Sequence, residues 1–472
     1  MNSAKLVIVA VAIAALAVAV QAGLTPDAAS FLVNTLTAGR QRQPDVALAG
    51  DGRALVVWDS DIDVDGQIAG RIVDADGVAR SGEFRISPSD TGSSHIRPVV
   101  AGFPSSGFVV AWENYIFDTD EDELLIQRVG PSGDLVGAEI VIDDSEFHFD
   151  ADISIGAGGG FVVVWGDGFD ILGRRFDASG GSLGGLFQVN DQLGTMYAPR
   201  VAAAADGAFA VVWEDRSSID GDGDGILLRQ FNPQGVPLGG DLQVNSTAEG
   251  DQYGAAIAMR SDGAFVVVWE AYAQTSLGDG AFGQAFSSSG QRVGGEFRVD
   301  SGESVYAGYV DAAAAGDEFV VLWSEPRDGS GEVLNTLMRT IDAGGTGGGI
   351  VDIDPDEEGD QAFGSLAGRG DAVMVAWQGI GPDAEDVFAQ RFDLVDVTPT
   401  QTPDPLETPS AICPGDCDGS DSVSISELVR AVNIALGMID VSMCTAADRN
   451  GDGNVAINEL IAAVNSALSG CP

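Results

Sequence analysis

Lysine and histidine are almost absent from this sequence of 472 residues. Lys5 is the only lysine, there are two histidines, and 72 acidic residues face 23 basic ones, which gives a net charge of -49. The negative electrostatic field of such a chain repels nucleic acid and anionic membranes, so neither is an expected partner. The chain also contains no nucleophile elbow, phosphate-binding loop or zinc-protease motif. No catalytic motif therefore identifies an enzyme.

Long apolar runs are absent beyond the N-terminus. There, Lys5 precedes the apolar run Leu6–Val20, and Val20-Gln21-Ala22 has the small-x-small pattern of a cleavage site. Residues 1–22 are therefore predicted to be a secretory signal peptide, with an uncleaved anchor as the alternative. No other spanning helix is expected. This predicts a secreted or cell-surface protein in an oxidising compartment.

Seven tryptophans mark an internal repeat. Each closes an apolar segment such as Phe265–Trp269, and successive tryptophans are 48 to 56 residues apart: Trp58, Trp112, Trp165, Trp213, Trp269, Trp323 and Trp377. A repeat of about 50 residues is typical of a propeller or a solenoid. Each repeat has four strand-like segments separated by turn signals such as Asp-Gly. We predict a mainly β fold, a seven-bladed β-propeller of four-stranded antiparallel blades over residues 23–396.

The two ends of the repeat region complement each other. The seventh repeat runs through Phe388–Phe392 but has no fourth strand, whereas Phe31–Asn34 precedes the first repeat. This N-terminal segment matches the fourth strands Phe187–Asn190 and Leu242–Asn245. We therefore expect it to complete the last blade and close the ring, because an open solenoid would need caps.

An aromatic residue or a histidine precedes the first strand of most repeats. Since the first two strands are antiparallel, this position shares one face with the acidic loops that follow the second strand. Such side chains could stack on sugar rings or hold another extended ligand; alternatively, they wedge between blades. The candidate ligand-binding residues are His95, Phe149, Tyr197, Tyr253, Tyr306 and Phe363.

Two of the acidic loops have the pattern Asp-x-Asp-x-Asp-Gly. Carboxylates at alternate positions of a tight turn suit calcium, and these loops resemble the calcium loops of integrin-type propellers. A solvated acidic turn is the alternative. The candidate ligands are Asp61, Asp63 and Asp65 in the first loop and Asp220, Asp222 and Asp224 in the second.

A Thr/Pro-rich segment, residues 397–412, is expected to be an extended linker. Beyond it, a twelve-residue acidic loop followed by an amphipathic helix occurs twice. The second loop matches the calcium-binding pattern in full, whereas Asp421 replaces the turn glycine of the first, so weaker binding is expected there. The expected calcium ligands are Asp416, Asp418, Ser420, Ser422 and Glu427, and then Asp448, Asn450, Asp452, Asn454 and Glu459.

These paired loop–helix units over residues 413–472 resemble a dockerin. The resemblance implies a small all-α calcium-binding domain, a cohesin-like partner and a bacterial protein that belongs to a polysaccharide-degrading system. Dockerins often carry hydroxyl residues at loop positions ten and eleven, where this chain has Ile425-Ser426 and Ile457-Asn458. A calcium-locked structural tail or a surface anchor is the alternative.

All four cysteines lie in this C-terminal module. Four cysteines allow three pairings. A module of this size has too small a core to be stable alone, so disulfides and calcium are expected to stabilise it. Antiparallel helices bring its ends together, which favours Cys413–Cys471 and Cys417–Cys444. Zinc is disfavoured because no histidine lies nearby.

Three functions follow from these patterns. The first is an exported protein whose propeller binds a glycan or a protein and whose tail attaches it to a partner. The second is a glycoside hydrolase or lyase with catalysis on the propeller face, although the Ser-x-Asp-x-Gly-x-Thr-Trp boxes of sialidases are absent. The third is a structural envelope protein. A pair of carboxylates near the axis, one with a raised pKa, would favour the enzyme.

Overall fold

The computed structural model divides the chain into two compact units, residues 1–398 and 399–472, which are described separately. It describes residues 22–27, 29–61, 66–89, 92–119, 121–144, 148–192, 194–217, 221–272, 278–302, 306–327, 333–355, 359–380, 385–396, 413–417, 420, 422–435, 439–448, 455 and 457–469.

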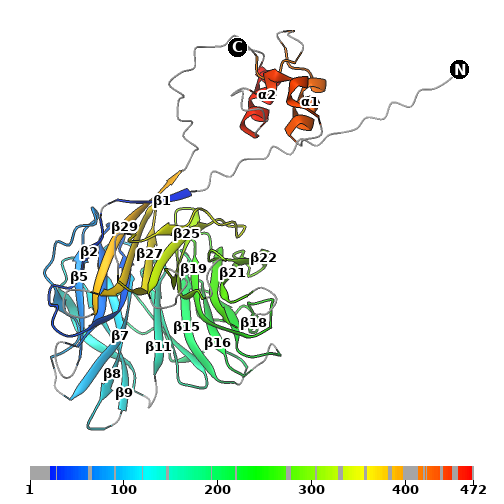
Figure 1. The fold of residues 1–472 in the computed structure, drawn as a ribbon. Helices are drawn as coiled ribbons and strands as arrows, with labels where there is room; N and C mark the ends of the chain where they lie inside the picture. Colours follow the sequence, from blue (N-terminus) through cyan, green and yellow to red (C-terminus); the bar gives the residue numbers. More distant parts are fainter. Residues whose placement is uncertain are drawn as a thin grey trace. The chain divides into compact units, whose positions relative to one another are not determined.

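The first unit is a seven-bladed β-propeller of antiparallel sheets (Figure 1). Six blades each use four consecutive strands, numbered from the inner strand outward. They are β3 (Gln41–Leu48), β4 (Ala54–Ser60), β5 (Gln67–Val73) and β6 (Phe84–Arg85); β7 (Ser93–Gly102), β8 (Phe108–Ile116), β9 (Glu121–Val129) and β10 (Leu135–Asp143); β11 (Phe149–Ile155), β12 (Phe161–Gly166), β13 (Ile171–Phe176) and β14 (Phe187–Gln188); β15 (Met196–Ala203), β16 (Phe209–Asp215), β17 (Gly225–Phe231) and β18 (Leu242–Gln243); β19 (Asp251–Met259), β20 (Phe265–Tyr272), β21 (Gly280–Phe286) and β22 (Arg292–Arg298); β23 (Gly308–Ala315), β24 (Glu318–Pro326), β25 (Leu334–Ile341) and β26 (Val351–Asp352).

The seventh blade is built from both ends of the propeller. It contains β27 (Gln361–Arg369), β28 (Ala372–Ile380) and β29 (Glu385–Asp396), and its outer strand is β2 (Phe31–Leu32). Phe31 lies opposite Ala389, which confirms that the N-terminal strand completes the last blade. A further strand, β1 (Ala22–Pro26), also pairs with β29 and was not expected. Inner strands of neighbouring blades are in contact all round, and β27 contacts β3, so the ring is closed.

An asparagine follows three of the outer strands, β2, β14 and β18, at the end of the segments Phe31–Asn34, Phe187–Asn190 and Leu242–Asn245. Its side-chain oxygen accepts a backbone hydrogen bond from the third strand of the same blade. The pairs are Asn34 with Val387 (2.8 Å), Asn190 with Ile171 (2.8 Å) and Asn245 with Ile226 (3.0 Å). The three segments share a motif because they share this role.

The repeated tryptophans form the contacts between blades. All seven are 0% exposed. Trp112 of the second blade, for example, shares a buried cluster with Leu55 and Val57 of the first. Large aromatic rings bury more apolar surface than other side chains and stabilise the core accordingly. One tryptophan per blade therefore accounts for the spacing seen in the sequence.

Every inner strand has a β-bulge at the same place, where its register with the second strand shifts. The residue at this bulge position has a left-handed φ of 47° to 60°. Only the fifth blade has a glycine there; the others have Gln43, Arg97, Asp150, Ala198, Tyr309 and Phe363. A left-handed backbone costs a non-glycine residue roughly 1–2 kcal/mol. Such strain is found most often at functional sites.

In its described residues the C-terminal unit contains two helices that contact each other, α1 (Ile425–Ala435) and α2 (Ile457–Ser469). Two short 3-10 turns, η1 (Val441–Met443) and η2 (Thr445–Ala447), lie between them. Cys417 is joined to Cys444 by a disulfide with an S–S distance of 1.99 Å, and Cys413 is also disulfide-bonded. Cys471 is outside the described residues. Among the described helices, none has the length and apolar character needed to cross a membrane.

Candidate functional site: a charged cavity on the propeller axis

The inner strands of all seven blades enclose a cavity of about 480 Å³ on the axis. Small-molecule sites usually measure roughly 300–1,000 Å³, so this cavity can hold a ligand of a few sugar units or less. Part of its wall is made of alanines, among them Ala202, Ala258 and Ala313. The rest carries charged side chains, and these give the cavity its chemistry.

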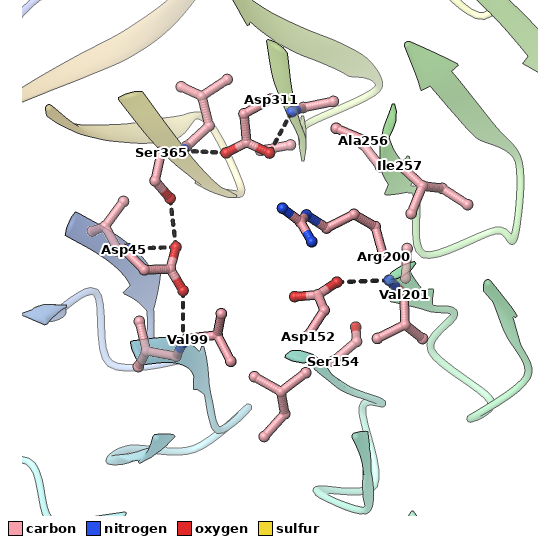
Figure 2. Close-up of a pocket in the computed structure, with 18 of the residues that line it drawn as sticks. Asp45, Val99, Asp152, Ser154, Arg200, Val201, Ala256, Ile257, Asp311 and Ser365 are labelled. Carbon is pink, nitrogen blue, oxygen red and sulfur yellow. Dashed lines mark hydrogen bonds between the residues drawn. The ribbon is translucent and has the colours of Figure 1, made fainter. Parts of the chain in front are cut away.

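Seven residues occupy equivalent positions around the cavity, and we call them the axial ring (Figure 2). Each lies two residues after the bulge position and is paired with the residue that precedes a tryptophan. The ring has three aspartates, one arginine, one serine and two apolar residues. Its members are Asp45, Val99, Asp152, Arg200, Ala256, Asp311 and Ser365.

Each axial aspartate accepts a hydrogen bond from a backbone N–H of the next blade. The distances are 2.6 Å from Val100 to Asp45, 2.6 Å from Val201 to Asp152 and 2.7 Å from Leu366 to Asp311. Ser365 of the seventh blade also donates to Asp45 of the first at 2.5 Å. The carboxylates therefore hold neighbouring blades together while facing the cavity.

The three axial carboxyls have raised pKa values. Burial is the main cause, and it raises the pKa of Asp152 to about 6 and that of Asp311 to about 7. The pKa of Asp45 is raised as well, again through burial. These groups reach the cavity but are surrounded by protein on their other sides. Burial therefore makes all three carboxyls hold a proton to higher pH than an exposed aspartate does.

Arg200 extends its guanidinium group into this cavity (Figure 2). Burial opposes its positive charge, but the nearby carboxylates of Asp152, Asp150 and Asp311 outweigh burial and raise its pKa. Its Nη1 donates to the carbonyl of Pro199 at 3.0 Å. Within the described part of the chain, no carboxylate forms a direct ion pair with this guanidinium. The cavity thus combines carboxyls of raised pKa with the positive charge of a guanidinium group.

Glutamates that follow the tryptophans support the bulges. Glu113 accepts a hydrogen bond from the N–H of Asp150 at 3.0 Å, and Glu270 accepts one from Tyr309 at 2.6 Å. Glu214 does the same for Gly254 at 2.7 Å. Burial raises the pKa values of Glu113 and Glu270 to about 7. Three of the seven bulges are therefore held by a glutamate of the preceding blade.

Most of the aromatic residues expected to surround the axis do not line the cavity. Of the six candidates only Phe363 does so, because it occupies a bulge position. His95 is 0% exposed and packs edge-on against Trp112, which leaves it no surface for a ligand. The other four are Phe149, Tyr197, Tyr253 and Tyr306, which are partly buried outside the cavity lining. Tyr197, for instance, packs under the guanidinium group of Arg216.

Tyr309 and the axial ring were missed in the sequence. The ring residue stands twelve or thirteen positions before each tryptophan, so aligning the repeats on their tryptophans would have revealed a column rich in aspartate. Tyr309 lies outside the aromatic column and is brought to the cavity only by the bulge of β23.

The acidic loops of the propeller face are only partly described. Asp61 pairs with Arg40 (3.2 Å) and Arg42 (3.1 Å), so two guanidinium groups already neutralise its charge. Asp224 lies 3.6 Å from Arg216, and Asp222 is exposed. The remaining candidates Asp63, Asp65 and Asp220 lie outside the described residues.

Two acidic side chains of the first C-terminal loop, Asp416 and Glu427, are buried. Asp416 accepts from the N–H of Ser420 at 3.1 Å, and Glu427 accepts from Cys417 at 2.8 Å and Ser424 at 2.7 Å. Carboxylate oxygens of this kind are the ligands that calcium prefers. In the second loop Glu459 is also buried. Across the described residues, no three metal-ligating side chains come together; Asp418, Asn450, Asp452 and Asn454 lie outside them, while Ser422 and Asp448 lie inside.

Fold and site together define a seven-bladed β-propeller with a charged axial cavity. No protein-family model and no curated protein sequence matches this chain. Among solved structures, a protein of unknown function from Dyadobacter fermentans is similar, with a TM-score of 0.50 and 10% identity over 79% of this chain and 100% of that one. At that identity the likeness shows the fold alone.

Two further solved structures are similar at lower TM-scores. One is a polysaccharide lyase, with a TM-score of 0.48 and 10% identity over 77% of this chain and 91% of that one. The other is an α-L-arabinanase from Penicillium chrysogenum, with a TM-score of 0.44 and 14% identity over 78% of this chain and 99% of that one.

Proposed function

We propose that this protein belongs to a polysaccharide-degrading system and hydrolyses a glycosidic bond in its axial cavity. The observation that carries the proposal is a pair of axial carboxyls, Asp311 with a pKa of about 7 and Asp152 with a pKa of about 6, in one cavity of about 480 Å³. Glycoside hydrolysis needs one protonated carboxyl and one ionised carboxylate on either side of the scissile bond. Different environments that separate two pKa values commonly distinguish the acid from the base.

In this mechanism Asp311 is the general acid. It gives its proton to the glycosidic oxygen as the bond from that oxygen to the sugar carbon breaks. Asp152 is the general base and takes a proton from the water whose oxygen bonds to the same carbon. Proton exchange with solvent then restores both carboxyls. Arg200 is a positioning residue that favours the ionised form of Asp152 through its charge.

The C-terminal unit is proposed to bind calcium and to attach the propeller to a cohesin-like partner. Asp416 and Glu427 are buried and hydrogen-bonded to their own loop, an arrangement that a bound cation would stabilise. The same residues would supply the oxygen ligands. Export to the cell surface or beyond agrees with this role.

A binding protein without catalysis is the second candidate. One observation favours it: each axial aspartate already accepts a hydrogen bond from the next blade. If that is all the carboxylates do, the cavity recognises a ligand and leaves it unchanged.

Substitution by asparagine separates the two candidates, because an asparagine oxygen can still accept the backbone hydrogen bond. In Asp311→Asn and Asp152→Asn we expect the release of reducing ends from a panel of polysaccharides to fall by roughly 10²–10⁴-fold, the range usual for general acid–base groups. At pH 5, where both carboxyls are mostly protonated and so neutral like the amide, the melting temperature should stay close to that of the unmodified protein.

The matched control is Asp59→Asn. Burial raises the pKa of Asp59 to about 6 as well, but this residue does not line the axial cavity. Its substitution should leave the rate unchanged. Full activity in Asp311→Asn, or no activity of the unmodified protein on any polysaccharide, would refute the hydrolase proposal.

A further inference from the structure

We propose that Tyr309 and Phe363 form an aromatic platform that stacks against a sugar ring, and that the substrate is a neutral polysaccharide. The inference rests on the proposed function, since it assigns a subsite and a substrate class to the same cavity. It concerns two residues that take no part in the proton transfers.

The platform is formed where two neighbouring blades meet. Tyr309 is at the bulge position of β23 and Phe363 at that of β27, and both line the axial cavity. Their ring centroids are 4.4 Å apart with an interplanar angle of 51°. Phe363 is 41% exposed. An exposed aromatic ring beside a cavity offers its face to a ligand.

The backbone conformation at Tyr309 and Phe363 indicates that their aromatic rings have a role beyond forming the bulge. Both have a left-handed φ, 54° for Tyr309 and 51° for Phe363. The fifth blade makes the same bulge with Gly254, and the fourth makes it with Ala198. The bulge therefore needs no aromatic residue, and a bulky one there bears a strain that glycine avoids. Their mutual ring contact offsets part of this strain.

The net charge of the chain favours a neutral sugar over an acidic one. The axial ring has three aspartates against one arginine, and the whole chain has a net charge of -49. Uronic acid or sulfated chains would be repelled on approach by the net negative charge of the chain. A neutral sugar can place its C–H face on the platform while its hydroxyls donate to Asp152 or Asp45. The hydroxyl of Tyr309 has no hydrogen bond to any described residue, so it can serve the same ligand.

Binding is best measured in the Asp311→Asn background, where cleavage does not interfere. The probes are hexasaccharides of xylose, glucose, mannose and arabinose, with a hexasaccharide of galacturonic acid as the acidic comparison. We expect at least one neutral probe to bind and the acidic probe to bind at least tenfold more weakly. Adding Tyr309→Ala or Phe363→Ala should weaken the neutral probe about tenfold each.

Gln43→Ala is the matched control, because Gln43 is the bulge residue of the first blade and also lines the cavity. It should change affinity by less than threefold. Alanine fits this backbone, as Ala198 shows, so the variants should remain folded; equal melting temperatures check this. Equal losses in all three variants, or tighter binding of the acidic probe, would overturn the platform.

Failure of the platform can be told apart from failure of the hydrolase proposal. If a neutral hexasaccharide binds through Tyr309 and Phe363 but the unmodified protein never cleaves it, the platform stands and hydrolysis is wrong. If the protein cleaves polysaccharide while both alanine variants keep full affinity, hydrolysis stands and the platform is wrong.

Discussion

Asp152 accepts a 2.6 Å hydrogen bond from the backbone N–H of Val201 across the boundary between the third and fourth blades. The same side chain faces the axial cavity (Figure 2). Asp311 has the same double role toward Leu366. The ionisation of the proposed site is therefore linked to the stability of the ring.

Stability should fall as the pH rises from about 4 to about 7. The folded-state pKa of Asp311 is about 7, above the ordinary value of 3.8, so over this range the folded state binds more protons than the unfolded state. The stabilisation of the folded state that Asp311 provides is complete below its unfolded-state pKa and is lost as the pH rises through its folded-state pKa. In Asp311→Asn this part of the decline should be missing, a difference on the order of 1 kcal/mol or more between pH 5 and pH 8. Urea unfolding of both proteins at several pH values measures it, and parallel curves would contradict it.

Replacing Arg200 by methionine should move the acidic limb of the rate profile to higher pH. The charge of Arg200 is the main influence that lowers the pKa of Asp152 against burial, so its removal raises that pKa further and leaves less of the general base ionised. We expect a roughly fivefold lower rate at pH 6 and little change at pH 8. Arg200→Lys keeps the positive charge and is the control, and it should retain most of the original profile. An identical loss at every pH would instead indicate a structural role.

Ring closure can be tested with two equivalent asparagines. Asn34 hydrogen-bonds to Val387 and Asp386 (2.8 and 2.6 Å), and Asn190 makes the same contacts with Ile171 and Asp170 (2.8 and 2.9 Å). Each alanine variant should lose about 1–3 kcal/mol of unfolding free energy.

Asn34→Ala should lose more unfolding free energy than Asn190→Ala. The chain itself joins β14 to its own blade, whereas β2 reaches β29 only through non-covalent contacts. Denaturant unfolding followed by tryptophan fluorescence provides the comparison. Equal losses would mean that closure adds nothing to the local hydrogen bonds.

Calcium should stabilise the C-terminal unit. If its loops bind the ion, then adding a chelator should lower the temperature of one calorimetric transition of the full chain and leave the propeller transition in place. Glu459→Gln, in the loop with the full calcium pattern, should reduce the calcium effect more than Glu427→Gln does. Asp262→Asn, in a propeller turn outside the candidate calcium loops, is the control. An unchanged thermogram with chelator would exclude structural calcium sites in the tail.

The blade architecture was predictable because burial imposes it on the sequence. A tryptophan between each pair of blades and an asparagine after several outer strands recur at regular spacing in the sequence. The shared motif alone was enough to place Phe31–Asn34 in the seventh blade. The strand β1 could not, because Ala22–Pro26 resembles no other strand and its pairing with β29 depends on where the ring closes.

The site was less predictable for a geometric reason. A bulge shifts the register of a strand by one residue, and side chains beyond it turn to the other face. Phe149 and Tyr253 were therefore expected at the axis, while Tyr309 and Asp311, which are at the axis, belonged to no recognised pattern. Burial of the axial carboxyls depends on all seven blades at once, which no single repeat reveals.

The pairing of Gly23 with Val395 has a topological consequence. Since the first and last residues of the propeller sheet are neighbours, a short peptide could join them, and the polypeptide could be opened instead at the Ser261-Asp-Gly263 turn. Such a circular permutant would move the composite blade from the seventh place to the fifth with the axial cavity intact. Which blade is built from both ends of the chain thus depends on where the polypeptide is opened, whereas the axial cavity depends only on the closed ring of seven blades.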